Sequence, residues 1–200
     1  MFWADRIAKE IEEKLGERAQ AKPLLIRDEK TLSGRVHIGS MRGVAIHGVI
    51  AEVLTEYGVA NEYRYELNDF DDFDSIPGYL DETVYREHLG KPLYAVPSPE
   101  LGYDSYADYY GDEFMRVHKK AGFTPSYYTA RELYASGKMD ALIKTALEHA
   151  ADIRRIQKEV SGSQKEDDWL PISVVCEQCG KIKTTRAIDF DGETVAYVCE

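Results

Sequence analysis

The order of apolar and polar positions divides the first third of the chain into alternating helices and strands. Ile7, Ile11 and Leu15 recur at helical spacing among charged residues, which predicts an amphipathic helix. The short run Leu24-Leu25-Ile26 follows Pro23 and predicts a buried parallel strand. In order, the pattern predicts a helix, a strand, a polar turn, a second helix and a second strand at 2–18, 24–26, 33–34, 38–57 and 62–67. This succession opens a doubly wound α/β sheet.

The rest of the chain reads as loops and helices followed by a different kind of sequence. We expect loop and short helix over 68–100, helices at 104–121 and 138–160, and a strand at 127–129. A polar segment at 161–168 then precedes short β segments that contain all three cysteines. This shift in composition predicts two domains, 1–165 and 166–200.

Composition narrows the class of protein. The 200 residues are 44% hydrophobic and 30% charged, as in ordinary globular proteins. No apolar stretch is long enough for a membrane span, and the N-terminus lacks the basic and apolar regions of a signal peptide. Three clustered cysteines are too few for a disulfide scaffold, so we expect a reduced, cytoplasmic protein with no membrane partner.

The net charge of −11 comes from one segment. Residues 61–113 contain fourteen acidic and three basic side chains, whereas acids and bases balance on either side. Such a segment repels nucleic acid and suits a cationic substrate or a divalent metal. A solvated acidic face explains it equally well.

The segment Thr31-Leu32-Ser33-Gly34-Arg35-Val36-His37-Ile38-Gly39-Ser40 joins the first strand to the second helix. The N-terminus of a helix presents unpaired N–H groups and the positive end of a dipole, which favours phosphate. His37 could donate to a phosphate oxygen, and Thr31 and Ser33 add hydroxyl donors. Gly39 lets an adenine or ribose approach the backbone closely. Attack on the α-phosphate of ATP needs such donors rather than a protein nucleophile.

The string Ser-Gly-x-x-His-Ile-Gly-Ser resembles the HIGH signature of class I aminoacyl-tRNA synthetases, and specifically of class I lysyl-tRNA synthetase. Three further segments resemble that family: Trp3–Ala8, the acidic and aromatic run Asn68–Pro77, and Ser105–Asp108 followed by Phe114–Arg116. The similarity covers essentially the whole chain. It implies a Rossmann-type catalytic domain over 1–165, in which lysine and ATP form lysyl-adenylate before transfer to tRNA(Lys), with Mg²⁺ accompanying ATP.

The resemblance also implies roles for individual residues. His37, Gly39 and Ser40 would be the catalytic residues, and the ATP and aminoacyl-adenylate site would be lined by Thr31, Ser33, Gly34, His37, Gly39 and Ser40. Asp69 and Asp71 follow a strand, at the edge where open α/β sheets bind ligands. Their carboxylates could hold the ammonium groups of lysine, or they could serve as ordinary turn residues.

Two departures from the family pattern stand out. The family usually has Gly-x-Thr-Pro-Ser-Gly before the histidine, whereas this chain has Glu29-Lys30-Thr31-Leu32-Ser33-Gly34, which places an anion at the rim of the pocket. The second class I signature, KMSKS, is absent from these 200 residues, and Gly137-Lys138-Met139-Asp140 reads as the start of a helix instead.

Cys176-x-x-Cys179 and Cys199 resemble most of a zinc knuckle within 166–200. Two thiolates on a turn and a third about twenty residues later can form three corners of a tetrahedral sulfur site. We expect Zn²⁺ there, with a water, a partner, Glu177 or Glu200 as the fourth ligand. Three free cysteines in a β-hairpin are the alternative.

The leading hypothesis is thus a class I lysine-tRNA ligase fragment that ends before the KMSKS loop and is poorly active alone. A non-catalytic, synthetase-like module that binds a nucleotide or a partner is the alternative, and Glu29 favours it. A small nucleotidyltransferase with the same signature is a third hypothesis, but it leaves the cysteines unexplained.

Overall fold

The computed structural model describes residues 2–200, except the side chains of residues 19 and 20. Its contacts divide the chain into two compact units. One unit comprises the chain up to Asp69 together with Ser98–Ala130, and the other comprises Phe70–Pro97 and Arg131–Glu200. The sequence-based boundary near residue 165 falls inside the second unit and stays a prediction. No helix in the described residues is long and apolar enough to cross a bilayer.

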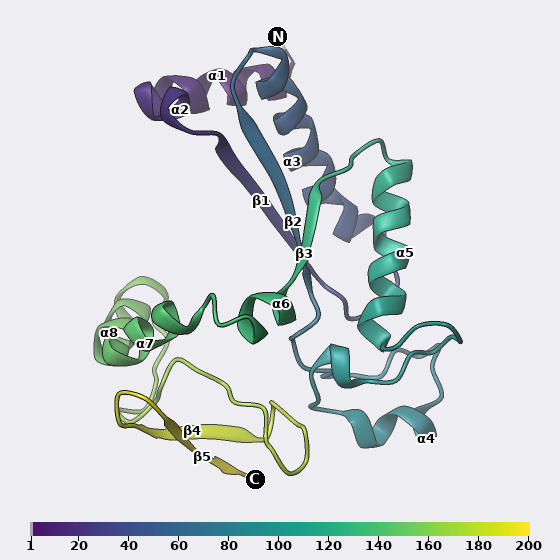
Figure 1. Cartoon of the computed structure of the whole chain (residues 1–200), viewed down its shortest axis with the longest axis vertical. Coiled ribbons are helices and arrows are strands. Elements are labelled where there is room, and N and C mark those ends of the chain that lie inside the picture. Colours follow the sequence, from purple (N-terminus) through teal and green to yellow (C-terminus); the bar gives the residue numbers. More distant parts are fainter. Residues whose placement is uncertain (1) are drawn as a thin grey trace. The chain divides into compact units, whose positions relative to one another are not determined.

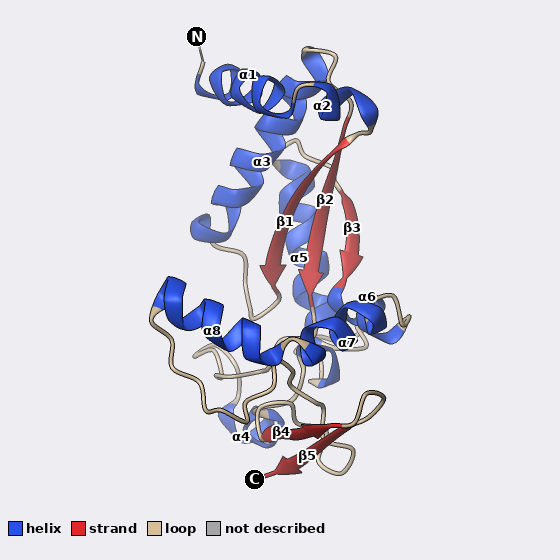
Figure 2. Ribbon diagram, turned by 90° about the vertical axis from the view of Figure 1, so that its left-hand side faces the viewer, coloured by secondary structure: helices blue, strands red, loops and turns tan. Residues whose placement is uncertain are grey.

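The first unit is built on a parallel three-stranded sheet in the order β1-β2-β3, which α3 and α5 cover on one face (Figures 1 and 2). The predicted α/β fold of Rossmann type is confirmed. Its elements are α1 (Trp3–Leu15), α2 (Glu17–Ala21), β1 (Leu24–Thr31), α3 (Ile38–Glu56), β2 (Asn61–Asn68), α5 (Tyr106–Lys120) and β3 (Ser126–Thr129).

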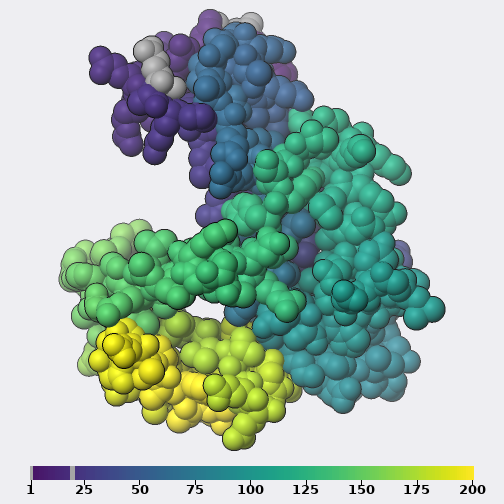
Figure 3. Space-filling model, in the orientation of Figure 1, coloured from purple at the N-terminus to yellow at the C-terminus, as the bar shows by residue number. Residues whose placement is uncertain are grey.

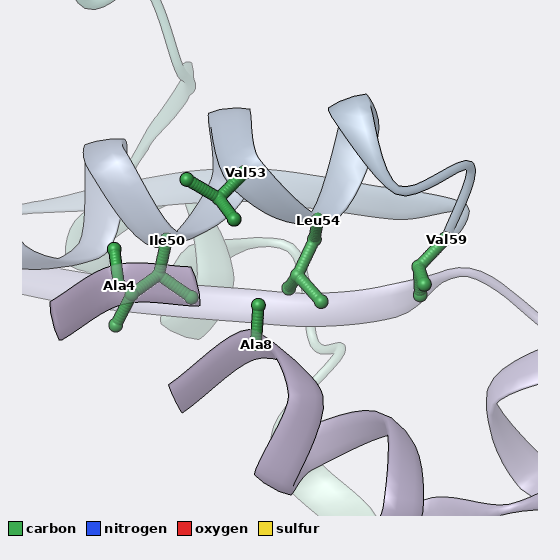
Figure 4. Packing of buried hydrophobic residues seen from close by; sticks show 6 residues of the cluster. All are labelled: Ala4, Ala8, Ile50, Val53, Leu54 and Val59. Carbon is green, nitrogen blue, oxygen red and sulfur yellow. The ribbon is translucent and has the colours of Figure 1, made fainter. Parts of the chain in front are cut away.

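Apolar packing of α1 against α3 stabilises the end of this unit where the strands begin. Ala4 and Ala8 lie one turn apart on α1 and are fully buried against Ile50 and Leu54 of α3 (Figure 4). The small alanine side chains let the two helices approach closely. The helix expected over 2–18 ends at Leu15, because Gly16 adopts a φ of 49° and separates α1 from α2.

The second unit contains short helices and a two-stranded antiparallel sheet. Its elements are α4 (Glu82–Tyr85), 3-10 turns at Arg86–His88 and Leu93–Ala95, α7 (Asp140–Glu148), α8 (Ala150–Ser161), β4 (Thr185–Phe190) and β5 (Val195–Cys199); α6 (Ala130–Ala135) begins at its boundary. The yellow β4–β5 hairpin lies beside α7, since Phe190 and Leu147 line one surface hollow (Figure 3). The single helix expected over 138–160 is wrong in one respect, because the chain breaks at His149 between α7 and α8.

Candidate functional site

The turn between β1 and α3 begins at the carboxyl edge of the parallel sheet. Thr31, the last residue of β1, lies opposite Asn68, the last residue of β2. The buried Leu32 continues this pairing, since its N–H donates to the Asn68 carbonyl at 3.1 Å. Gly34 has a φ of 152°, which favours glycine. The predicted segment is therefore a strand–turn–helix, at the position where open α/β sheets bind ligands.

Two side chains of α5 hold this turn in place. The Tyr106 hydroxyl donates to the Ser33 carbonyl at 2.9 Å, and the Glu113 carboxylate accepts from the Val36 N–H at 2.9 Å. Tyr106 is fully buried. Neither residue was predicted to belong to the site, because nothing in the local sequence pattern separates them from other residues of an amphipathic helix.

His37 is the N-cap of α3 and forms a reciprocal pair of contacts with Ser40. Its Nδ1 accepts from the Ser40 N–H at 3.3 Å, and its own N–H donates to Ser40 Oγ at 3.2 Å. An Nδ1 that accepts a hydrogen bond is unprotonated, so the neutral ring carries its proton on Nε2. The imidazole thus offers one N–H donor beside the positive end of the α3 dipole.

Gly39 has a role in this geometry that the sequence did not indicate. A Cβ at this position would stand 3.0 Å from both Cε1 and Nδ1 of His37, closer than side chains normally approach. Glycine therefore leaves room for the imidazole itself, in addition to the expected close approach of a nucleotide. Both residues are exposed, as a binding surface requires.

Lys30 places a cation beneath the same turn. Its ammonium donates to the Thr31 carbonyl at 3.1 Å. Burial lowers the pKa of Lys30, and the nearby Glu113 carboxylate partly opposes this effect. Lys30 was expected only as part of the departure from the family pattern, but its ammonium adds positive potential beside the turn between β1 and α3.

Glu29, the anion that departs from the family pattern, lies at the carboxyl end of β1. Its carboxylate accepts from the Asn68 amide at 3.1 Å, and its carbonyl accepts from the Tyr65 hydroxyl at 3.2 Å. The Glu29 side chain is therefore held against β2 by a hydrogen bond.

The two candidate lysine-binding carboxylates belong to different units. Asp69 follows β2 in the first unit and is buried. Asp71 is exposed in the second unit, where one of its carboxylate oxygens accepts from the Asp72 N–H at 3.1 Å. Contact of either one with lysine stays a prediction.

The three cysteines of the second unit come together as predicted. The Sγ atoms of Cys176, Cys179 and Cys199 all lie within 4.8 Å of one another, and the Cys179–Cys199 separation is 3.7 Å. A tetrahedral zinc ion with Zn–S bonds of about 2.3 Å holds its sulfur ligands about 3.8 Å apart. The spacing of the thiols therefore fits a zinc ion.

The electrostatics around Cys176 favour the thiolate that a metal requires. The backbone N–H groups of Cys179 and Gln178 lower the pKa of the Cys176 thiol to about 7. The Thr184 hydroxyl lies 3.2 Å from Cys199 Sγ and lowers the pKa of that thiol, but the neighbouring Cys176 and Cys179 raise it overall. The raised pKa reflects repulsion between neighbouring thiolates, and a bound cation would relieve this repulsion.

Among the described residues, the group of possible metal ligands contains the three cysteines alone, without Glu177 or Glu200. Three thiols at tetrahedral spacing leave one corner for a ligand from elsewhere.

Comparison with known proteins agrees with this architecture. Residues 1–200 match the family described as "tRNA synthetases class I (K)". The chain belongs to this family. A lysine–tRNA ligase from Methanosarcina barkeri is 36% identical over 201 residues, and those from Methanocaldococcus jannaschii and Thermoplasma acidophilum are 32% and 28% identical over 202 and 200 residues.

The alignments with these relatives cover the whole of this chain but only part of each relative. These three alignments include 100% of this chain and 36%, 37% and 37% of the respective relatives. The chain thus spans about a third of the length of the lysine–tRNA ligases that it matches. The turn with His37 and the cysteine cluster both lie within the matched residues.

Proposed function

We propose that this chain is the part of a class I lysine–tRNA ligase that binds ATP and activates lysine. In this reaction a carboxylate oxygen of lysine attacks the α-phosphorus of ATP. The bond to the bridging oxygen breaks, and pyrophosphate leaves with the electron pair. A hydroxyl at the 3′ end of tRNA(Lys) then attacks the carbonyl carbon of the lysyl group, and AMP leaves with the electron pair of the broken bond. Mg²⁺ would accompany ATP as its counter-ion.

The capping geometry of His37 supports the proposal most directly. Because Nδ1 is occupied by the Ser40 N–H, the Nε2 proton is the one available to a phosphate oxygen. Backbone N–H groups in the first turn of α3 and the hydroxyls of Thr31 and Ser33 provide further donors, and the exposed Gly39 keeps the approach open. These donors stabilise negative charge that develops on the phosphate as the bond to pyrophosphate breaks.

The proposal for lysine binding rests on the negative charge of the residues that follow β2. The carboxylate of Asp69 or of Asp71 would hold an ammonium group of lysine, a role suited to the acidic character of residues 61–113. The cytoplasmic location remains a prediction. The non-catalytic module is less well supported than the ligase, because the family match extends over the whole chain.

Calorimetric titration of the 200-residue chain with Mg-ATP tests the proposal. His37→Ala should weaken binding about tenfold, since it removes a hydrogen bond to a charged group worth about 1.5 kcal/mol. His149→Ala is the matched control, because it removes an exposed histidine from the second unit. Equal affinities of wild type and His37→Ala would exclude His37 from the site, and absence of any ATP binding would contradict the proposal itself.

A further inference from the structure

Three backbone segments of the second unit are joined in turn by hydrogen bonds. We call each of them a layer and the three together the stack, and the acidic segment that contains Asp71 is the first layer. Its immediate neighbour is the segment around Gly90. The Leu93 N–H donates to the Asp71 carbonyl at 2.9 Å, the Phe73 N–H donates to the Lys91 carbonyl at 2.8 Å, and the Gly90 N–H donates to the Phe73 carbonyl at 2.9 Å. Three backbone hydrogen bonds thus fix residues 71–73 against residues 90–93.

The third layer is the loop of the cysteine cluster. The Gly90 carbonyl accepts from the N–H groups of both Ile182 and Lys183, at 2.7 and 3.2 Å. One residue earlier, the Lys181 carbonyl accepts from the N–H of Cys176 at 2.8 Å. A continuous chain of backbone hydrogen bonds therefore leads from a candidate metal ligand to the acidic segment.

One side-chain contact spans the stack directly. The Lys183 ammonium lies 3.6 Å from a carboxylate oxygen of Asp72, which is largely buried. That Asp72 oxygen accepts no hydrogen bond from the described residues, so Lys183 is its neutralising partner. The cysteine loop thus supplies the charge that a buried carboxylate beside Asp71 requires.

The close approach of the second and third layers depends on glycine. Gly90 has a φ of 84°, and a Cβ there would stand 3.2 Å from Cβ of Lys183. A side chain at position 90 would therefore both strain the backbone and separate the layers.

We propose that metal binding at Cys176, Cys179 and Cys199 positions the acidic segment 71–73, with Lys183 as a positioning residue. The part of this proposal that concerns lysine binding rests on the proposed function, since it assumes that Asp71 contacts the substrate. The physical basis is independent of it. The loop 180–184 lies between ligands at 179 and 199, so a bound metal restricts the loop, and the hydrogen bonds of Gly90 transmit that restriction.

Amide hydrogen exchange on the zinc-loaded chain, before and after a chelator, tests the coupling. We expect the amides of Phe73, Gly90 and Leu93 to exchange about tenfold faster after chelation, together with those of the cysteine loop. The amides of β2 in the first unit are the internal reference and should not change. Faster exchange confined to 176–199, or no change anywhere, would overturn the proposal.

Variants of Lys183 separate positioning from general stability. Lys183→Ala should speed exchange at 71–73 while zinc still protects 185–199, and Lys183→Arg should restore slow exchange because it keeps the charge beside Asp72. Lys158→Ala removes the same charge from α8 and is the matched control. Unchanged exchange at 71–73 in Lys183→Ala would remove Lys183 from the proposal.

The outcome is separable from that of the proposed function. The ATP titration reports on the first unit, whereas these exchange measurements use zinc and chelator alone and report on the second. ATP binding without coupling would leave the ligase proposal intact and defeat this one, and coupling without ATP binding would do the reverse.

Discussion

Asp28 of β1 and His47 of α3 form a partly buried contact, with Asp28 Oδ2 2.9 Å from His47 Nδ1. The other Asp28 oxygen accepts from the Glu29 N–H at 2.8 Å. The Asp28 side chain is 15% exposed and the His47 side chain 37%. β1 and α3 flank the turn that contains His37. The contact between Asp28 and His47 therefore joins the strand before this turn to the helix after it.

His47→Ala should therefore destabilise the first unit. The substitution leaves the partly buried Asp28 carboxylate without this contact, which should cost about 1 kcal/mol of unfolding free energy. Urea denaturation measures the change. His149→Ala, at a largely exposed pair with Asp152, should cost less than about 0.5 kcal/mol. Equal effects of the two variants would show that the Asp28–His47 pair contributes little.

Gly43→Ala should lower stability even though alanine normally favours a helix over glycine by about 1 kcal/mol. A Cβ at position 43 would stand 2.5 Å from Asp28 Oδ2, so the carboxylate must shift, which disturbs its 2.9 Å contact with His47. Gly111→Ala in α5 is the matched control, since its Cβ would meet Leu32 Cδ1 at an ordinary 3.4 Å. Thermal unfolding should give a lower Tm for Gly43→Ala than for Gly111→Ala. The reverse order would contradict the tight contact.

His118 should make the chain sensitive to acid. The ring is fully buried among aromatic side chains, and this burial lowers its pKa to about 4, with the Asp28 charge opposing the effect. Between pH 6.5 and 4 the unfolded chain binds a proton that the folded chain does not, so stability falls as the pH falls. The loss approaches about 3 kcal/mol at pH 4, because each pKa unit corresponds to about 1.4 kcal/mol.

His118→Phe isolates this contribution. Neither ring nitrogen has a hydrogen-bond partner among the described residues, so phenylalanine gives up no polar contact there. Denaturation at pH 7 and pH 4.5 should show a smaller loss of stability for the variant than for wild type. A loss of the same size in both would assign the acid sensitivity to other groups.

Zinc should protect the three cysteines from alkylation. Cys179 and Cys199 are exposed and should react with iodoacetamide in the metal-free chain, whereas Cys176 is buried and should react more slowly. After zinc is added, mass spectrometry should find little modification at any of the three. Cys179→Ser should abolish the protection of Cys199, because two thiols no longer form a stable site. Rapid alkylation of wild type in zinc would show that the thiols do not hold the metal.

The fold was predictable where one physical signal dominated. The apolar run at 24–26 and the period-two pattern at 62–67 both identified strands, but β1 continues to Thr31 through four charged residues. That continuation was missed because parallel strands are expected to be apolar on both faces, whereas here Asp28 and Lys30 point towards polar partners. The break at His149 was missed because apolar spacing continues across it.

The residues of the candidate site were likewise predictable only where a local sequence pattern identifies them. The turn with His37 and the cysteine cluster are encoded in short local strings, so their positions could be predicted. Tyr106 and Glu113 contact the turn from more than seventy residues away in the sequence. Contacts of that kind depend on how α5 packs on the sheet, and a single sequence contains no pattern that specifies them.

If His37 binds ATP as proposed, its mutual cap with Ser40 has a consequence for how quickly a nucleotide is captured. An imidazole free in solution samples several rotamers, and only a fraction of encounters would find it correctly aimed. In the folded chain, the contacts with Ser40 hold the His37 side chain in one rotamer. The side-chain entropy of His37 is therefore lost when α3 forms, and it is not lost again when a ligand binds. At the proposed ATP site, an arriving phosphate would meet a donor whose direction is set in advance.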